Sequence, residues 1–461
     1  MRRDCSSCAT ISINRCAVRA SGKFGGKLGV SVLMCVALLF ELKLKCATTA
    51  GNKNCTNMAA STAQSLSTDR LPSLDGLDVK GKRVLLRVDY NIPSNSEGGL
   101  SDDYRISATL PTIKRLVAAG ARVGILTHRG RPGGRSIPEL STKPLAGILS
   151  QLLGQEVEHV PDCVGRVAEL AMEKLAPGQI LMFENVRYHL GEQMNQAPFI
   201  QQLAKLGDVF VNDAFATAHR PHASTSGLAA VMPVSVLGDL MMRELQWLKR
   251  IATDPKKPLL LVLGGKGVEL KVNLLRHMLG KVDTVMLGGA IANTFMAARD
   301  LGLGQSLLAP DFVDDARDLL TEAGVVGCRL HLPQDVWVHD ANNLNKPAEI
   351  RPSHSIEAQD SVLDIGPQTL ATWQRLVADA GTIVFIGSLG VAEEAEGREG
   401  SLGLVKALVE QRNFSLVGGN GMLPLLHETG LRERLPALST GGAALVDGLI
   451  GKPFPCLTVL K

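Results

Sequence analysis

Cysteines, internal repeats and common phosphate-loop signatures are scarce in this chain of 461 residues. Six of the nine cysteines lie within the first 55 residues, and the other three, Cys163, Cys328 and Cys456, are far apart. This spacing excludes a disulfide framework and a cysteine-based metal site beyond residue 55. No short repeat follows residue 68, which excludes a solenoid. No GxxxxGK(S/T) segment occurs, which excludes a Walker-type loop.

Excess charge is also absent once the first segment is set aside. Residues 1–68 contain nine Lys/Arg and two Asp/Glu, which leaves 40 Lys/Arg against 43 Asp/Glu in the remaining 393 residues, a net charge of −3. A general nucleic-acid partner is therefore not indicated. Hydrophobic residues make up 45%, charged residues 20% and aromatic residues 4%. This mixture excludes collagen-like, disordered and coiled-coil proteins and allows a sizeable core.

The first 68 residues are typical of a targeting leader. Their hydrophobic run, residues 28–40, is thirteen residues long, whereas a membrane-spanning helix needs roughly 20. Basic residues precede this run, and residues 55–68 are rich in Ser, Thr and Ala and free of acidic residues. The pattern predicts a two-part leader that directs the protein to a plastid (chloroplast). One alternative is that the hydrophobic run is a retained anchor, which would make a membrane-tethered structural protein. The other is a mis-assigned start codon, in which case the protein would be cytoplasmic.

Short apolar runs alternate with helical patterns from residue 83 onward. The runs are apolar on both faces, as buried parallel strands are, and alternation of strand and helix indicates α/β architecture. We expect two doubly wound parallel-sheet domains, because so long a stretch is too large for one sheet. The predicted strands cover residues 83–90, 122–128, 179–185, 208–213, 259–265, 284–289, 328–333, 382–387 and 414–419.

A long helix predicted over residues 237–253 separates these halves. It is followed by the polar stretch DPKKP at 254–258, which predicts the helix end. The expected N-terminal domain is 69–236 and the expected C-terminal domain is 254–438, with a final segment over 439–461.

Arginines and histidines follow the predicted strands of the N-terminal half. Ligands in open α/β sheets bind at the carboxyl ends of the strands, and strand alternation places Arg87, Asp89 and Asn91 on one face. A guanidinium is a planar fork that matches carboxylate and phosphate oxygens. One arginine alone is ordinarily a solvated surface charge, but the whole set favours a small hydroxylated acid carrying phosphate. Its other members are Arg105, His128, Arg129, Arg131, Arg187, His219, Arg220 and His222.

Glycine pairs occupy the predicted strand ends of the C-terminal half. Glycine lets backbone N–H groups approach a phosphate, so the pairs indicate a nucleotide or phosphate floor. Tight strand–helix turns without a ligand are the alternative. The pairs are Gly264-Gly265, Gly288-Gly289, Gly418-Gly419 and Gly441-Gly442.

Motifs in order along the chain resemble those of the phosphoglycerate kinase family over about residues 75–445. They are RVDYNIP, THRGRPGG, ENVRYH, LGDVFVNDAFATAHRPH, LDIGP and LSTGG. The resemblance implies two Rossmann-like domains joined by a hinge, with residues 439–461 returning to the N-terminal domain. It implies a monomer with no nucleic-acid or membrane partner once the leader is removed. The implied activity is reversible phosphoryl transfer between 1,3-bisphosphoglycerate/ADP and 3-phosphoglycerate/ATP, in glycolysis or the Calvin cycle.

The resemblance also assigns residues to the two substrates. Arg105 and Lys271 match the family's catalytic groups. Matching the acid-binding positions are Asp89, Asn91, Arg105, His128, Arg131, Arg187 and Arg220. Matching the positions for Mg-ATP or Mg-ADP are Gly264, Gly265, Lys271, Gly288, Glu393, Gly418 and Gly419.

The nucleotide motifs depart from the family pattern. GGAKVxDK has Gly267 in place of its first lysine, and GGGDT reads Gly418-Gly419-Asn420-Gly421-Met422, with Gly421 at the aspartate that holds Mg²⁺. The Mg²⁺ ligand is therefore unknown. Glu393 and Asp335 are candidate replacements for the lost aspartate, and Lys266 is the candidate replacement for the lysine lost at Gly267. Losing one transition-state donor typically costs roughly 10²–10³ in rate. The alternative hypothesis is thus a pseudoenzyme that binds 3-phosphoglycerate.

Overall fold

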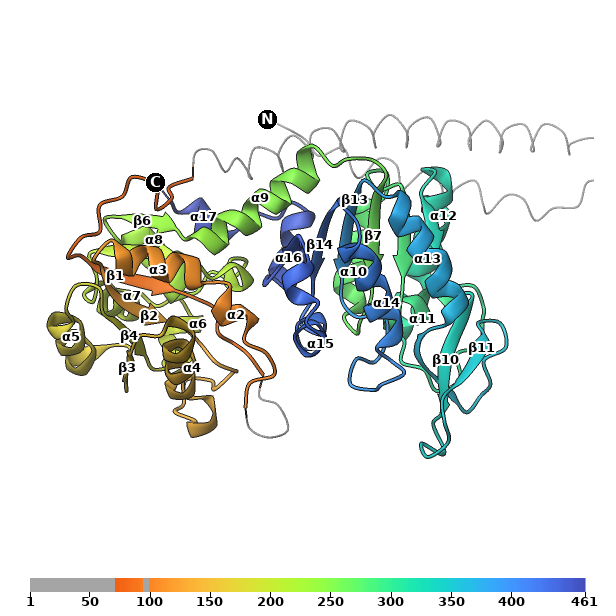
Figure 1. The fold of residues 1–461 in the computed structure, drawn as a ribbon, viewed down its shortest axis with the longest axis horizontal. Coiled ribbons are helices and arrows are strands. Elements are labelled where there is room, and N and C mark those ends of the chain that lie inside the picture. Colours follow the sequence, from red (N-terminus) through yellow and green to blue (C-terminus); the bar gives the residue numbers. More distant parts are fainter. Residues whose placement is uncertain (1–70, 94–98, 461) are drawn as a thin grey trace, which may run out of the picture. The chain divides into compact units, whose positions relative to one another are not determined.

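The structure, a computed structural model, describes residues 71–93 and 99–460. The predicted leader, including its run at 28–40, lies outside the described residues. Within them, two six-stranded parallel sheets account for the α/β class that the sequence predicts (Figure 1). No helix among the described residues combines the length and the apolar character needed to cross a membrane.

The N-terminal sheet has the strand order β3-β4-β2-β1-β5-β6. Val84 and Leu86 of β1 contact one buried cluster and Leu85 contacts another, so both faces are covered. Residues from α3 and α4 complete the first cluster, and residues from α5 and α7 the second. The strands are β1 (Arg83–Arg87), β2 (Arg122–Leu126), β3 (Val157–Val160), β4 (Ile180–Phe183), β5 (Val209–Asn212) and β6 (Ser235–Leu237). The helices are α2 (Tyr104–Ser107), α3 (Leu110–Ala118), α4 (Lys143–Leu153), α5 (Gly165–Lys174), α6 (Leu190–Gln193), α7 (Ala197–Ala204) and α8 (Leu228–Val231).

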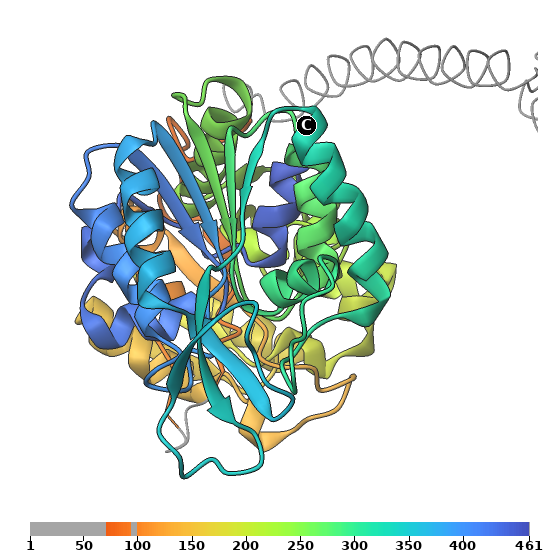
Figure 2. The same ribbon diagram turned by 90° about the vertical axis from the view of Figure 1, so that its right-hand side faces the viewer.

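The C-terminal sheet has the order β15-β14-β13-β7-β8-β9. Leu261 of β7 contacts the cluster on one face and Val262 the cluster on the other, and helices cover both faces (Figure 2). The strands are β7 (Leu259–Leu263), β8 (Thr284–Leu287), β9 (Arg329–His331), β13 (Thr382–Ile386), β14 (Phe414–Gly418) and β15 (Ala437–Leu438). The helices are α10 (Val268–Met278), α11 (Gly289–Ala297), α12 (Val313–Val325), α13 (Pro367–Asp379), α14 (Glu399–Val409), α15 (Met422–Thr429) and α16 (Ala443–Leu449).

A three-stranded antiparallel sheet between β9 and α13 was not predicted. Its order is β11-β10-β12, with β10 at Asp335–Asp340, β11 at Glu349–Pro352 and β12 at Asp360–Ile365. Its strands carry charged and exposed positions, so they lack the apolar runs that mark the buried strands. The strands β3, β6 and β15 also escape sequence reading, because each is only two to four residues long and forms no extended apolar run.

The long helix α9 spans Asp239–Thr253; it begins two residues later than predicted and ends at the predicted residue. Leu237 ends strand β6 instead, and Gly238 turns the chain into the helix. A Cβ on Gly238 would lie 2.3 Å from Asp213 Oδ1. The same carboxylate oxygen accepts a hydrogen bond from the Met241 backbone N–H at 2.9 Å, which fixes the start of the helix.

The C-terminal segment contacts both halves. Helix α16 packs in the buried cluster on one face of the C-terminal sheet. After it, Phe454 meets Phe215 edge to face at 5.7 Å between ring centroids. Val459 and Leu460, which follow α17 (Pro455–Thr458), pack against a core cluster of the N-terminal sheet; Figure 1 shows α17 among the elements of that half.

Candidate active site

Each sheet has one point at which the chain stops adding strands on one side and begins adding them on the other. The polar groups of the site lie near these two points. In the N-terminal sheet this point lies between β1 and β5, and in the C-terminal sheet between β7 and β13. A crevice forms at the carboxyl ends of strands that diverge in this way. The strands with predicted polar ends stop one to three residues earlier than predicted, so most of those polar residues lie in loops.

The first buried cation of the site is Arg87, the last residue of β1. Its Nη2 lies 3.1 Å from His128 Nδ1, and its Nε donates to Ser224 Oγ at 2.8 Å. Ser224 in turn donates to the buried Glu192 at 2.7 Å. Burial lowers the pKa of Arg87, while Glu192 and Asp89 act in the opposite direction.

Asp89 holds the next cation. Arg105 Nη1 donates to Asp89 Oδ2 at 2.9 Å, and His128 Nδ1 lies 3.9 Å from Oδ1. Burial alone would raise the pKa of Asp89, but Arg105, His128 and Arg87 outweigh it and hold that pKa well below its usual value. Burial lowers the pKa of His128 well below its usual value, so the imidazole is neutral near pH 7.

Arg187 has donors that no described residue uses. Its Nη1 donates to the Gly130 carbonyl oxygen at 2.7 Å, whereas its Nε and Nη2 are buried without a hydrogen-bond partner. Nδ1 of His219 and Nδ1 of His222 are also buried without a hydrogen-bond partner. Burial, helped by Arg87 and Arg220, lowers the pKa of Arg187 to about 10. Unsatisfied buried donors beside positive charge are the mark of an anion site.

The structure brings most of the predicted acid-binding residues together. Asn91 Oδ1 accepts from the Gly130 N–H at 2.7 Å, and Arg220 Nε donates to His219 Nε2 at 3.1 Å. Arg131 is the exception, because its side chain is exposed to solvent. Arg129 donates to the Ser141 carbonyl oxygen at 3.3 Å and so ties two loops together.

A cavity of about 470 Å³ lies at the carboxyl ends of β7, β13 and β14. Of the residues predicted to bind nucleotide, Gly265, Lys271, Glu393 and Gly419 line it.

Gly264, Gly288 and Gly418 do not line the cavity. Each of these glycines permits close packing instead; a Cβ on Gly264, for example, would lie 2.1 Å from the Ser388 carbonyl oxygen. A neighbouring loop lies too close for a side chain at Gly264 and Gly288, and the Leu445 side chain of α16 lies too close at Gly418, so packing rather than a ligand requires glycine at these three places.

Three charged residues line this cavity among those described, namely Lys266, Lys271 and Glu393. Lys271 is buried, and its burial lowers the pKa of the ammonium group to about 8. Lys266 Nζ lies 3.8 Å from Glu393 Oε1, and both side chains are exposed. An exposed pair of this kind contributes little stability, so Lys266 remains available to a ligand.

The residues at this cavity do not fit a protein-held Mg²⁺. Glu393 is the only carboxylate among the described lining residues, and it faces Lys266. At Gly421 a Cβ would meet nothing closer than Ser388 Oγ at 3.5 Å, so the position is open but carries no ligand atom. Asp335 does not replace it, because its carboxylate accepts from the Gln368 and Thr369 backbone N–H groups at the start of α13.

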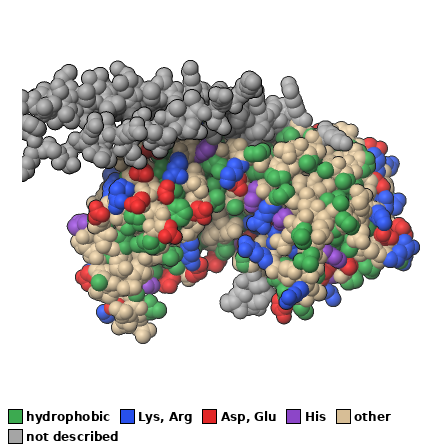
Figure 3. Space-filling view, turned by 180° about the vertical axis from the view of Figure 1, so that it is seen from behind, with side chains coloured by type: hydrophobic (Ala, Val, Ile, Leu, Met, Phe, Trp, Pro, Cys, Tyr) green, Lys and Arg blue, Asp and Glu red, His purple; other side chains and the backbone are tan. Residues whose placement is uncertain are grey.

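A smaller cavity of about 220 Å³ borders both halves. Its lining includes Asn91 and Arg105 from the N-terminal half and Asn420 from the C-terminal half. Asn420 also lines the larger cavity. Figure 3 shows Lys, Arg and His side chains at the inner edge of the N-terminal half, beside the hollow between the halves.

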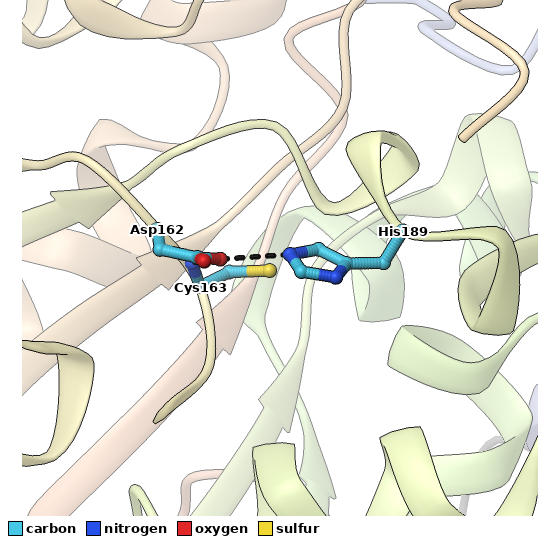
Figure 4. Close-up of side chains that lie close together, drawn as sticks. All are labelled: Asp162, Cys163 and His189. Carbon is cyan, nitrogen blue, oxygen red and sulfur yellow. Dashed lines mark hydrogen bonds and ion pairs between the residues drawn. The ribbon is translucent and has the colours of Figure 1, made fainter. Parts of the chain in front are cut away.

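A separate group, Asp162, Cys163 and His189, lies outside both cavities (Figure 4). His189 Nε2 and Asp162 Oδ1 are 2.7 Å apart, and the same carboxylate oxygen accepts from the Cys163 and Val164 N–H groups before α5. Burial raises the pKa of the Cys163 thiol well above its usual value, so the sulfur stays protonated. These three residues form a hydrogen-bonded arrangement before α5, and Cys163 is not a reactive cysteine.

Two doubly wound sheets, one ending in an unsatisfied cationic site and the other in a glycine-lined cavity, define a two-lobed α/β protein built for anionic ligands. The chain belongs to the phosphoglycerate kinase family, whose model matches residues 74–452. The phosphoglycerate kinase of Thermomicrobium roseum is 42% identical over 83% of this chain and 97% of its own length. That of Pelotomaculum thermopropionicum is 40% identical over 83% and 97%.

Solved structures agree with the family. The Coxiella burnetii phosphoglycerate kinase superposes with a TM-score of 0.71 at 36% identity, covering 84% of this chain and 98% of that one. The Pyrococcus horikoshii enzyme gives a TM-score of 0.75 at 29% identity, covering 85% and 98%. None of these comparisons supports the pseudoenzyme alternative.

Sequence reading missed some of the residues that shape the site. Ser224 and Glu192, which anchor Arg87, lie in segments with no motif of their own. Asn420 was noted in the sequence only as part of a degraded glycine motif. The one sequence signal for this part of the site was strand alternation, which places Arg87 on the same face as Asp89. The structure confirms that alternation, because Val88, Tyr90 and Ile92 pack in the core.

The pKa of Lys271 predicts a pH limit for nucleotide binding. A pKa of about 8, below the usual value for lysine, means that the ammonium is charged below pH 8 and neutral above it. The affinity for ADP should therefore fall above this pH, by about tenfold at pH 9, as measured by calorimetry. Lys271→Met should remove the break and exposed Lys266→Met should keep it; a dissociation constant that is flat from neutral to alkaline pH would contradict the prediction.

Gly421→Asp should make ADP binding respond to Mg²⁺. The substitution adds a carboxylate where the space is open, so Mg²⁺ should tighten ADP binding on the order of tenfold more in the variant than in the wild type, about 1.4 kcal/mol. The measurement is the ratio of ADP dissociation constants with Mg²⁺ and with a chelator. Gly324→Asp, which adds the same charge at an exposed position of α12, is the control. Equal Mg²⁺ dependence in all three proteins would show that another group already holds the ion.

Proposed function

We propose that this protein catalyses reversible phosphoryl transfer between 1,3-bisphosphoglycerate/ADP and 3-phosphoglycerate/ATP. The observation that carries the proposal is the pair of buried, unpartnered Arg187 donors beside Arg87, Arg220 and neutral His222. Such a set binds a small polyanion, because phosphate and carboxylate oxygens satisfy every free N–H group at once. Family membership supplies the identity of the acid.

The remaining residues take complementary parts in this proposal. Arg105, at the border between the cavities, faces the phosphoryl group as it moves from one substrate to the other. Lys271 supplies positive charge to the nucleotide phosphates in the larger cavity. The co-substrate is Mg-ATP or Mg-ADP, as in the family; because the lining residues do not fit a protein-held ion, no step here depends on one.

We further propose a location and a setting. The leader pattern over residues 1–68 supports import into a plastid, where the reaction would serve the Calvin cycle as well as glycolysis. The mature protein would act as a monomer without a membrane partner. Sequencing the N-terminus of the protein isolated from its source tests the location, because an N-terminus upstream of residue 28 would mean that the hydrophobic run is retained.

A coupled assay on the full chain tests the activity. Formation of ATP from 1,3-bisphosphoglycerate and Mg-ADP should proceed at roughly 1–100 per second, the range typical of kinases. Circular dichroism establishes that the sample is folded, and calorimetry measures 3-phosphoglycerate binding. A folded protein that binds 3-phosphoglycerate but turns over at background would be a pseudoenzyme, and the proposal would fail.

Arg187→Met should selectively damage the acid site. Two charge-assisted hydrogen bonds at about 1.5–3 kcal/mol each predict that KM for 3-phosphoglycerate rises on the order of 10²-fold or more, while KM for ATP changes little. Arg166→Met, on the exposed surface of α5, is the matched control and should leave both constants unchanged. A variant with wild-type KM for 3-phosphoglycerate would show that Arg187 does not bind the acid.

A further inference from the structure

Arg105 is held from both halves of the protein. Its Nη1 donates to Asp89 Oδ2 at 2.9 Å within the N-terminal half. Its Nη2 donates to Asn420 Oδ1 at 3.2 Å, across 315 positions of sequence. The side chain is nearly buried, and Tyr104 of the same short helix α2 donates to the Leu438 carbonyl oxygen of the C-terminal half at 2.6 Å. The orientation of this guanidinium therefore depends on Asn420 as well as on Asp89.

Asn420 stands at the junction of the two cavities. It follows strand β14, it lines both cavities, and its side chain is exposed to the solvent within them. Gly442 gives it room, because a Cβ on that residue would lie 3.1 Å from Asn420 Oδ1. The GGGDT motif that this stretch resembles has glycine at the position of Asn420, so the contact with Arg105 is made by a side chain that the motif lacks.

The chemistry of an amide suits this contact. The Asp89 carboxylate offsets the charge of Arg105 on one side, and a second carboxylate would neutralise it further. An amide oxygen accepts a hydrogen bond without adding negative charge, so the guanidinium is oriented and still carries its positive charge toward the cavities. This matters here because Gly267 leaves the nucleotide side without the lysine expected at that position.

We propose that Asn420 is a positioning residue that holds Arg105 at the junction of the two cavities, where the guanidinium stabilises the phosphoryl group in transfer and takes over part of the role of the cation missing at Gly267. The proposal rests on the proposed function. It also explains how a chain with a degraded nucleotide motif retains catalysis, since a single well-oriented guanidinium can contact the charge that develops on the transferring oxygens.

Steady-state kinetics of Asn420→Gly test the proposal on the full chain. We expect kcat to fall roughly ten- to a hundredfold, the effect of a misplaced catalytic group, with KM for 3-phosphoglycerate and for ATP within about twofold of wild type. Asn420→Asp should lower kcat at least as much, because it neutralises Arg105. Asn342→Gly, at an exposed position of the turn between β10 and β11, is the matched control and should behave as wild type.

A double-mutant cycle separates positioning from a structural role. Arg105→Lys removes the fork that Asn420 orients, so it should reduce kcat much less in the Asn420→Gly protein than in the wild type. Fully additive losses, or an unchanged kcat in Asn420→Gly beside an active wild type, would overturn the positioning role alone. An inactive but folded wild type would overturn the proposed function and, with it, this inference.

Discussion

Buried positive charge at the carboxyl end of the N-terminal sheet is the constraint on which the site depends. Arg87, Arg105 and Arg187 are all withdrawn from solvent, and burying an ion costs several kcal/mol unless other groups compensate. The protein compensates unequally. Arg87 has Ser224 and, beyond it, Glu192; Arg105 has Asp89 and Asn420. Arg187 keeps two donors free. The uncompensated part of the cluster is the part that an anionic substrate completes.

The parallel sheet makes this concentration of charge possible. The three arginines come from the end of β1, from α2 and from the turn after β4. These segments are separated in sequence but meet at the carboxyl ends of the strands. Apolar residues on alternate positions, such as Leu86 and Val88, anchor each strand in the core. Packing thus fixes the backbone of Arg87 between them, and its hydrogen bond to Ser224 then orients the side chain. A rigid support of this kind allows like charges to remain close together before a ligand arrives.

The sequence alone predicts most of this architecture, because the buried parallel strands can be recognised as apolar runs. The runs at 83–90 and 259–265 predict β1 and β7, and the resemblance predicts both substrate sites. Sequence fails where the physical signal is weak. Edge strands such as β3 and the polar strand β11 carry no such run. Arg131 belongs to a matching motif, yet its side chain is exposed in the structure. Motif membership fixes the path of the backbone more firmly than the direction of a long side chain.

The acid site and the nucleotide cavity differ in how much of each could be predicted from the sequence. In the acid site, function depends on side chains, so the identities of Asp89 and Arg187 already carry the information. In the nucleotide cavity, glycine serves two purposes that one letter cannot distinguish. Gly265 lines the cavity, whereas Gly264 permits the loop of Ser388 to approach. Only the three-dimensional arrangement separates them.

The same arrangement changes the meaning of the degraded motif. Loss of charge at Gly267 and Gly421 lies on the nucleotide side, while the cations of the acid side are intact and one of them, Arg105, reaches the border through Asn420. A phosphoryl group in transfer belongs to both substrates at once, so charge supplied from either side can stabilise it. In this chain, therefore, more of the positive charge that stabilises the transferring phosphoryl group comes from the acid half, and less comes from the nucleotide half.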